Sequence, residues 1–151
     1  MYHVIHMPLL EKQLFIKRSK IPGAGKGLFT KELIPKGTRI IEYKGKKTTW
    51  KKVQQSNVFN AYVYYINLNH VIDARLSLKS LARYANDAKG LIKTKGIVNN
   101  SEYVKDNGRI FIEATKDIPK GSEILVAYGK EYWDVIKSNQ KIDDSAKKKK
   151  R

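Results

Sequence analysis

A glycine-rich loop, Pro22-Gly23-Ala24-Gly25-Lys26-Gly27, is the first segment of the chain whose residue types suggest ligand binding. Three glycines within five positions remove Cβ atoms and permit positive φ, so main-chain groups can approach a small molecule closely. The loop is not a P-loop, because Lys20 stands where that motif needs its first Gly and Gly27 stands where it needs Ser or Thr. It is not the dinucleotide fingerprint G-x-G-x-x-G either, because Leu28 stands where the third Gly belongs. The loop therefore indicates either main-chain contact with some other ligand or a structural turn.

Two tyrosines occupy equivalent places in an internal repeat. Thr30 to Thr38 leads into Ile40-Ile41-Glu42-Tyr43, and Thr115 to Ser122 leads into Ile124-Leu125-Val126-Ala127-Tyr128. Each unit has a Pro-Lys-Gly turn, an apolar run, a terminal Tyr and a Gly soon after it. The repeat predicts a pseudo-symmetric core in which two strands deliver a tyrosine to similar ends. Recurrence of common turn chemistry is the alternative.

Several kinds of catalytic and metal site are excluded by composition. The chain has no Cys, which excludes disulfides, thiolate zinc sites and cysteine nucleophiles. His3, His6 and His70 have no metal-ligand spacing, and no G-x-S-x-G elbow supports a serine triad. We therefore expect no metal, and a reducing intracellular compartment fits the absence of Cys.

Short strands dominate the elements that must position these residues. We predict strands at 13–17, 27–30, 39–43, 61–67, 70–73, 109–114 and 123–127, with 61–67 and 70–73 forming a hairpin through Leu68-Asn69. Short helices are expected around Leu76 to Ala82 and from Lys130 to Ser138. Many short strands separated by Gly, Pro and Asn indicate a mainly β fold of small sheets.

Four separated pieces occur in a characteristic order. They are Gly23 to Phe29, Glu42-Tyr43-Lys44-Gly45, Leu81 to Asp87, and Gly121 to Gly129 followed by Glu131-Tyr132-Trp133. In this order and spacing the chain resembles the SET-domain protein lysine methyltransferases over roughly residues 14 to 135, in particular the compact, zinc-free bacterial and viral members.

The resemblance implies both a fold and a reaction. The fold would have small curved β sheets, few short helices and a threaded C-terminal pseudoknot, within a SET domain at residues 1–138. The reaction would transfer a methyl group from S-adenosylmethionine to a lysine amine of a protein, leaving S-adenosylhomocysteine. Donor and lysine would enter from opposite faces of a narrow channel.

The resemblance also implies roles for individual residues. Tyr128 matches the tyrosine beside the transferred methyl, Tyr43 matches a tyrosine of the lysine channel, and Tyr103, in the segment after Asn99-Asn100, matches a further channel tyrosine. The donor would be held by main chain of the glycine loop and by the segment that follows Arg83. These donor residues are Ala24, Gly25, Lys26, Gly27, Asn86 and Asp87. Val126 with Tyr103 suits a tight channel that adds one methyl.

The chain departs from the family pattern at two places. The family usually has Asn-His where this chain has Asn86-Asp87, and Asp adds a negative charge that either favours a cationic donor or weakens activity. Flanking cysteine-rich zinc segments are absent, so another group must cover the donor's adenine. Trp133 is the candidate, with plain core packing as its alternative.

The charge points to polyanionic partners. Lys and Arg number 31 against 14 Asp and Glu, a net charge of +17, which attracts nucleic acid, acidic protein segments or anionic lipid, or simply confers solubility. A histone-like or other DNA-associated protein is the suggested substrate, although the enzyme would repel a lysine-rich peptide unless DNA or an acidic flank screened it. A non-catalytic SET-like module that binds nucleic acid is the rival interpretation.

The end of the chain has its own character. Residues 139–151 are predicted to be a flexible basic tail, and Lys147 to Arg151 resembles either a nuclear address or a nucleic-acid clamp. No membrane span or signal peptide is expected. The expected location is intracellular: the cytoplasm for a bacterial protein, or the nucleus if the tail is an address.

Overall fold

The computed structural model describes residues 9–56, 60–89, 94–129 and 132. In these residues the strands form three small antiparallel sheets and helix is scarce, which confirms the predicted mainly β fold. The elements are η1 Glu11–Gln13, β1 Leu14–Arg18, β2 Lys26–Thr30, β3 Arg39–Glu42, β4 Lys46–Thr48, α1 Trp50–Gln55, β5 Val63–Asn67, β6 His70–Asp73, η2 Leu81–Tyr84, β7 Ser101–Asp106 and β8 Arg109–Ala114.

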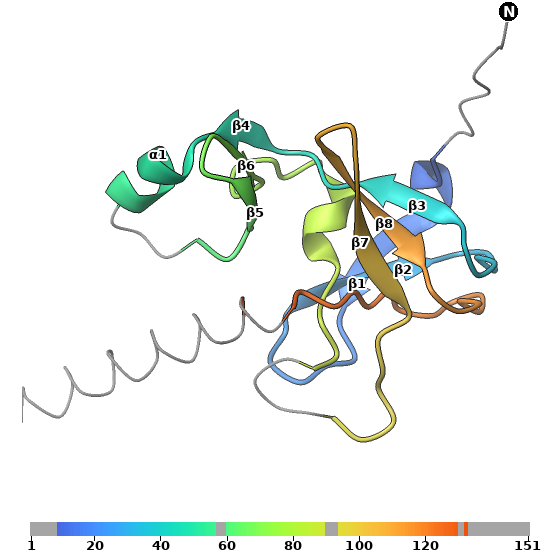
Figure 1. The fold of residues 1–151 in the computed structure, drawn as a ribbon. Helices are drawn as coiled ribbons and strands as arrows, with labels where there is room; N and C mark the ends of the chain where they lie inside the picture. Colours follow the sequence, from blue (N-terminus) through green and yellow to red (C-terminus); the bar gives the residue numbers. More distant parts are fainter. Residues whose placement is uncertain (1–8, 57–59, 90–93, 130–131, 133–151) are drawn as a thin grey trace, which may run out of the picture.

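The sheets lie in two groups (Figure 1). The β1–β2 hairpin and the β3-β8-β7 sheet lie close together at one end, and the β4-β6-β5 sheet with α1 extends to the other. Helix α1 begins at Thr49, whose side chain accepts a hydrogen bond from Lys52 N at 3.3 Å. Neither β4 nor α1 was predicted from the sequence, because three residues and six residues give too little periodicity to detect.

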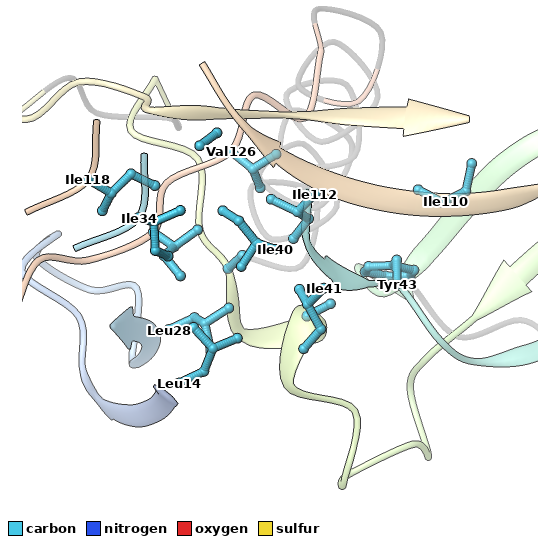
Figure 2. Close-up of a cluster of buried hydrophobic side chains, with 14 of the residues drawn as sticks. Leu14, Leu28, Ile34, Ile40, Ile41, Tyr43, Ile110, Ile112, Ile118 and Val126 are labelled. Carbon is cyan, nitrogen blue, oxygen red and sulfur yellow. The ribbon is translucent and has the colours of Figure 1, made fainter. Parts of the chain in front are cut away.

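The core lies between the first two sheets and the C-terminal segment. Its side chains are mostly Ile, Leu and Val that are less than a tenth exposed, and Figure 2 shows them meeting from strands far apart in the sequence. Ile34 lies beside Ile118 there, and each is fully buried. Burial of such a side chain contributes about 1.5–3 kcal/mol, so this cluster fixes how the sheets meet.

The two Pro-Lys-Gly units are related in space as well as in sequence. Ile34 and Ile118 exchange two main-chain hydrogen bonds, of 2.9 and 2.8 Å. Gly37 N donates to Ala114 O, at the end of β8, and Gly121 N donates to Thr30 O, at the end of β2. Each turn therefore closes on the strand that precedes the other unit, as expected of a pseudo-symmetric core.

The predicted strand at 123–127 is wrong as a strand, because its residues bond to three different segments. Ile124 N donates to Leu28 O, Val126 N donates to Asn86 O, and Leu125 O accepts from Asn100 N and Ser101 N. The segment forms only isolated bridges and is threaded between β2, Asn86 in the segment after η2, and β7. This threading is the arrangement that the resemblance implied for the C-terminal segment.

Two further expectations need correction. No strand was predicted around Tyr103, but Tyr103 lies on the regular strand β7. This strand joins β8 through Asn107-Gly108, both at positive φ (51° and 75°). An Asn-Gly pair between apolar strands is a strong hairpin signal and was available in the sequence. The region from Leu76 to Ala82 is not an α-helix: it forms turns and then the short 3₁₀ helix η2.

Other expectations fall on parts of the chain that the structure does not describe. The helix predicted from Lys130 to Ser138, the boundary at residue 138 and the basic tail all lie outside the described residues, apart from Tyr132. Among the described residues, no helix has the length and apolar character needed to cross a membrane.

Candidate active site

The glycine loop is a tight turn between β1 and β2 that exposes its main chain. Gly23 and Gly25 have φ of 79° and 72°, and Ser19 N donates to Gly25 O at 2.7 Å. Gly27 is buried and must be glycine for a different reason: a Cβ added there would lie 2.4 Å from Glu123 Oε2. The loop therefore needs glycine for conformation at two positions and for space at the third.

Glu123 joins the glycine loop to the segment containing Asn86. Its carboxylate is 5% exposed and accepts hydrogen bonds from Ser19 Oγ at 2.7 Å and Lys20 N at 2.9 Å. Asn86 Nδ2 donates to Lys26 O at 3.0 Å and lies 3.4 Å from Glu123 Oε2. A buried carboxylate needs several donors, and here they come from two separate segments, Ser19-Lys20 and Asn86.

Sequence reasoning assigned no role to Glu123. The available signal was an ionisable residue inside the apolar run that follows Gly121-Ser122. Such a residue either faces solvent or holds other polar groups in place. The hydrogen bonds from Ser19 and Lys20 show that Glu123 holds polar groups in place.

An open hollow of about 620 Å³ lies over the β1–β2 hairpin. Its lining residues are Ile16, Lys17, Arg18, Gly25, Lys26 and Tyr84. The size falls in the range usual for small-molecule sites. Two residues of the predicted donor loop line it, and Asn86 adjoins it through its bond to Lys26 O. The hollow thus combines exposed main chain, an aromatic ring and positive charge.

Tyr43, Tyr103 and Tyr128 converge from three distant segments. The ring centroids of Tyr43 and Tyr103 are 5.9 Å apart, and those of Tyr103 and Tyr128 are 6.3 Å apart. Tyr64 on β5 joins them at 5.1 Å from Tyr103, and Tyr132 lies 4.8 Å from Tyr128. We call these five residues the tyrosine cluster. Tyr64 was missed because its Val-Tyr-Tyr-Ile context is typical of any strand.

Both tyrosines of the repeat are fixed through their hydroxyl groups. The Tyr43 hydroxyl donates to Tyr62 O at 2.8 Å, and the Tyr128 hydroxyl donates to Ala85 O. Burial raises the pKa of Tyr43 and of Tyr128 well above the ordinary value. Both phenols are therefore neutral at pH 7 and act as hydrogen-bonding groups.

The remaining phenols of the cluster are neutral at pH 7 as well. Burial raises the pKa of Tyr103 in the same way. It also raises the pKa of Tyr64, and that of Tyr132 to about 12.

Asp87, which stands where the family usually has His, is a buried anchor. Its Oδ2 accepts from Tyr128 N at 2.9 Å, and its Oδ1 accepts from Lys89 N at 2.8 Å and from Asn99 Nδ2 at 2.9 Å. Asn99 in turn accepts from Ala88 N at 2.8 Å. Asp87 therefore holds Tyr128 and also both ends of the 88–99 loop.

The predicted site residues separate into two groups. Gly25 and Lys26 line the hollow and Asn86 adjoins it, with Ala24 and the buried Gly27 in the same loop, while Asp87 links Asn86 to the tyrosine cluster. Val126 is fully buried in the core. Trp133 lies outside the described residues. In the described part of the chain, no three His, Asp or Glu side chains come together as metal ligands.

The family follows from comparison with known sequences. Residues 25–129 match the SET domain, which is more than half of the chain. The chain belongs to the SET domain family, as its resemblance predicted.

Three similar proteins add detail. The chain is 24% identical over 120 residues to the N-lysine methyltransferase KMT5A-A of Danio rerio, covering 72% of this chain and 33% of that protein. It therefore spans about a third of that relative. It is 29% identical over 109 residues to the large ribosomal subunit protein eL27 of Tetrahymena thermophila, covering 71% of this chain and 73% of that protein.

Among solved structures, the fold is similar to the methyltransferase domain of human PR domain-containing protein 2. The TM-score is 0.57 at 27% sequence identity, covering 78% of this chain and 77% of that one. The similarity covers more than three quarters of each chain, so the fold agrees with the SET assignment.

Proposed function

We propose that this protein is an S-adenosylmethionine-dependent protein-lysine N-methyltransferase. The observation that carries the proposal is the convergence of Tyr43, Tyr103 and Tyr128 beside a segment that also reaches the glycine loop. Membership of the SET family and similarity to two proteins named as methyltransferases support it.

The hollow fits a donor of this kind. Exposed main chain at Gly25 and Lys26 offers hydrogen bonds, the Tyr84 ring offers an apolar face, and Lys17, Arg18 and Lys26 offer positive charge for a carboxylate. When bound, S-adenosylmethionine would supply a methyl group on a sulfonium and leave as S-adenosylhomocysteine. Ala24 and Gly27 complete the loop that would hold it, with Asn86 beside them.

The tyrosine cluster suits the lysine side of the reaction. Free lysine titrates near 10.4 and is charged at pH 7, but a dry aromatic channel disfavours the ammonium, so its proton leaves to solvent before reaction. The neutral phenols of Tyr43 and Tyr128 then hold the amine by hydrogen bonds. Alignment of this kind contributes up to about 7–11 kcal/mol in favourable systems.

Asp87 has a positioning role in this proposal. It fixes the main chain of Tyr128, while Ala85 O fixes the hydroxyl of the same residue. The ring is therefore held at both ends. This anchor replaces whatever the usual His provides, and it favours an active enzyme over a weakened one.

The direct test is methyl transfer by the full chain. The protein is incubated with S-adenosylmethionine and mixed cellular proteins, and mass spectrometry detects added methyl groups on lysines, those of its own tail included. Tyr128→Phe is the matched control and should lose most of the signal. Absence of methylation together with absence of donor binding by calorimetry would contradict the proposal. A histone-like protein is tried with duplex DNA added to screen its charge, and a single methyl is expected because Val126 with Tyr103 suits a tight channel.

A second candidate is a non-catalytic module that binds nucleic acid. The net charge of +17 and the similarity to a ribosomal protein favour it. It predicts no affinity for the donor and binding to nucleic acid that falls steeply with salt. Calorimetry with the donor therefore separates the two candidates.

A further inference from the structure

One stretch of the chain carries positive charge without any acidic residue. Residues 44–72, which we call the lysine lobe, contain five lysines and no acidic residue, whereas residues 73–129 contain ten basic and seven acidic residues. The lobe lysines are Lys44, Lys46, Lys47, Lys51 and Lys52, and all five are exposed. The lobe comprises β4, α1, β5 and most of β6, and it forms one end of the molecule (Figure 1).

The lysine lobe reaches the tyrosine cluster directly. Tyr64 is a residue of β5, and Lys44 follows Tyr43 in the chain. In the sheet register Lys47 is opposite Ile72, and Ile72 is opposite Tyr64. Paired residues of antiparallel strands share a face, so Lys47 lies in the same row as a tyrosine of the cluster. Any protein that presents a lysine to the cluster therefore places its neighbouring residues near these cations.

The acidic residues at the border of the lobe are already engaged. Glu42 binds Arg109 through both carboxylate oxygens, and that guanidinium, with smaller effects of Lys44 and Lys47, lowers the pKa of Glu42. Asp73 Oδ1 accepts from Asn60 Nδ2 and from Arg75 N, both at 2.9 Å. Both carboxylates lie at the border of the lobe, where Asp73 is paired in register with Lys46 and Glu42 is bound to Arg109.

A further cation lies on the same side. The Arg83 guanidinium sits 4.1 Å from the ring centroid of Tyr62, the residue whose carbonyl accepts from the Tyr43 hydroxyl. Positive charge thus borders the cluster on two elements, η2 and β4. A basic substrate segment would meet repulsion there, and an acidic one attraction.

We infer that the substrate lysine lies in an acidic segment, with Asp or Glu on its flanks that contact the lysine lobe. The inference rests on the proposed function and names the substrate class of that same site. The five lobe lysines outnumber the two border carboxylates, Glu42 and Asp73, and attract an acidic segment over about one Debye length, roughly 8 Å at physiological salt. A lysine-rich substrate would need a polyanion to screen the lobe.

The test compares two peptides of equal length with one central lysine, flanked either by Glu and Asp or by Arg and Ala. Methylation of each by the full chain is measured at several salt concentrations. The acidic peptide should have the higher kcat/KM, by about tenfold at low salt, and the ratio should shrink as salt rises. Equal or greater kcat/KM for the basic peptide would overturn the inference.

Charge-reversal variants localise the effect. Lys44→Glu with Lys47→Glu should abolish or invert the preference. The matched control is Lys36→Glu with Lys120→Glu, two exposed lysines of the Pro-Lys-Gly turns, which should leave the preference intact. If both double variants change the preference equally, net charge and not the lobe is responsible, and the inference is wrong.

Two binding measurements separate this inference from the proposed function. Both peptides are also made with norleucine for lysine, and their affinity is measured by fluorescence anisotropy beside donor calorimetry. Tighter binding of the acidic peptide without donor binding would contradict the enzyme but support the lobe as an acidic-segment site. If duplex DNA binds through Lys44 and Lys47 while the two peptides bind alike, the lobe serves nucleic acid and the inference fails.

Discussion

The two Pro-Lys-Gly units share a sequence pattern but hold their tyrosines in different ways. Tyr43 ends a run in which β3 pairs with β8, and Tyr43 N donates to Ile110 O at 2.8 Å. Tyr128 ends a threaded segment, and Tyr128 N donates to the Asp87 carboxylate. One tyrosine is thus held by a sheet and the other by a side chain.

The difference shows that the hydrogen-bonding neighbours of an apolar run decide whether it forms a regular strand. Both runs are rich in Ile and both follow a glycine at positive φ, namely Gly37 and Gly121 at 86° and 81°. The first run forms its main-chain hydrogen bonds with one continuous strand, β8. The second run forms them with Leu28, Asn86 and Asn100, which belong to three different segments. Side chains such as Asp87 and Asn100 supply the hydrogen bonds that a neighbouring strand would otherwise give.

The largest expected effect is on catalysis by the two tyrosines. Tyr128→Phe should lower kcat by about a hundredfold, because misplacement at the reacting centre has effects of that order. Tyr43→Phe should lower kcat by about tenfold, since it removes one hydrogen bond of about 1 kcal/mol. Single-turnover methylation measures both. Equal losses would show that the units are equivalent in function despite their different anchors.

The anchor of Tyr128 can be removed almost isosterically. Asp87→Asn replaces one acceptor oxygen with a donor that faces an N–H group, so the free energy of unfolding should fall by about 2 kcal/mol. The loss of kcat should exceed any change in KM for the peptide, because the ring of Tyr128 is displaced. Urea unfolding and steady-state kinetics test this. Unchanged kcat in a folded Asp87→Asn protein would rule out the positioning role.

The two turn glycines provide a symmetric comparison. An added Cβ meets no atom within 4 Å at Gly37 or at Gly121, so Gly→Ala at either position tests backbone conformation alone. Each substitution should destabilise the fold by about 1 kcal/mol, because L residues disfavour positive φ. Thermal unfolding of the two variants should give equal losses. A clear inequality would mean that the turns are not equivalent.

The smallest effect concerns alkaline stability. The pKa of Tyr132 rises from 10 to about 12 on folding, and those of Tyr43 and Tyr128 also rise. Below pH 10 both states keep these protons, so stability is independent of them. Between pH 10 and 12 the unfolded state loses its protons first, and stability falls as pH rises.

Removing either tyrosine of the repeat should reduce the loss of stability with rising pH. Tyr43→Phe and Tyr128→Phe should each show a shallower loss of stability above pH 10, by at most one proton per molecule. Urea midpoints measured from pH 9 to 11.5 give the slopes. A steeper loss in either variant would contradict the assignment of these phenols as neutral groups.

Much of the fold was predictable from the sequence. The alternating strands and the repeat gave β2, β3 and β8, the β5–β6 hairpin and the pairing of the two units. The threading of 123–126 was visible only through the family resemblance, because its partners are single residues in three segments. The short β4 and α1 left no periodic signal, and β7 was missed although Asn107-Gly108 marked its turn.

The candidate site was predictable in its residue types and less so in its connections. Tyr43, Tyr103 and Tyr128 were chosen from the resemblance, and the structure brings their rings together. Glu123 and the anchoring bonds of Asp87 were not foreseen, since a buried carboxylate is recognised by its donors and these come from residues up to 104 positions away. Such contacts have no local sequence pattern.

The reciprocal Ile34–Ile118 pairing has a consequence for the nascent chain. The two residues are 84 positions apart, so their pairing can form only after most of the chain has been synthesised. During synthesis on the ribosome, the tyrosine cluster therefore cannot be completed until the segment that carries Tyr128 has been added. A truncated translation product ending before Tyr128 would be inert toward lysine, however well its first hairpin had formed.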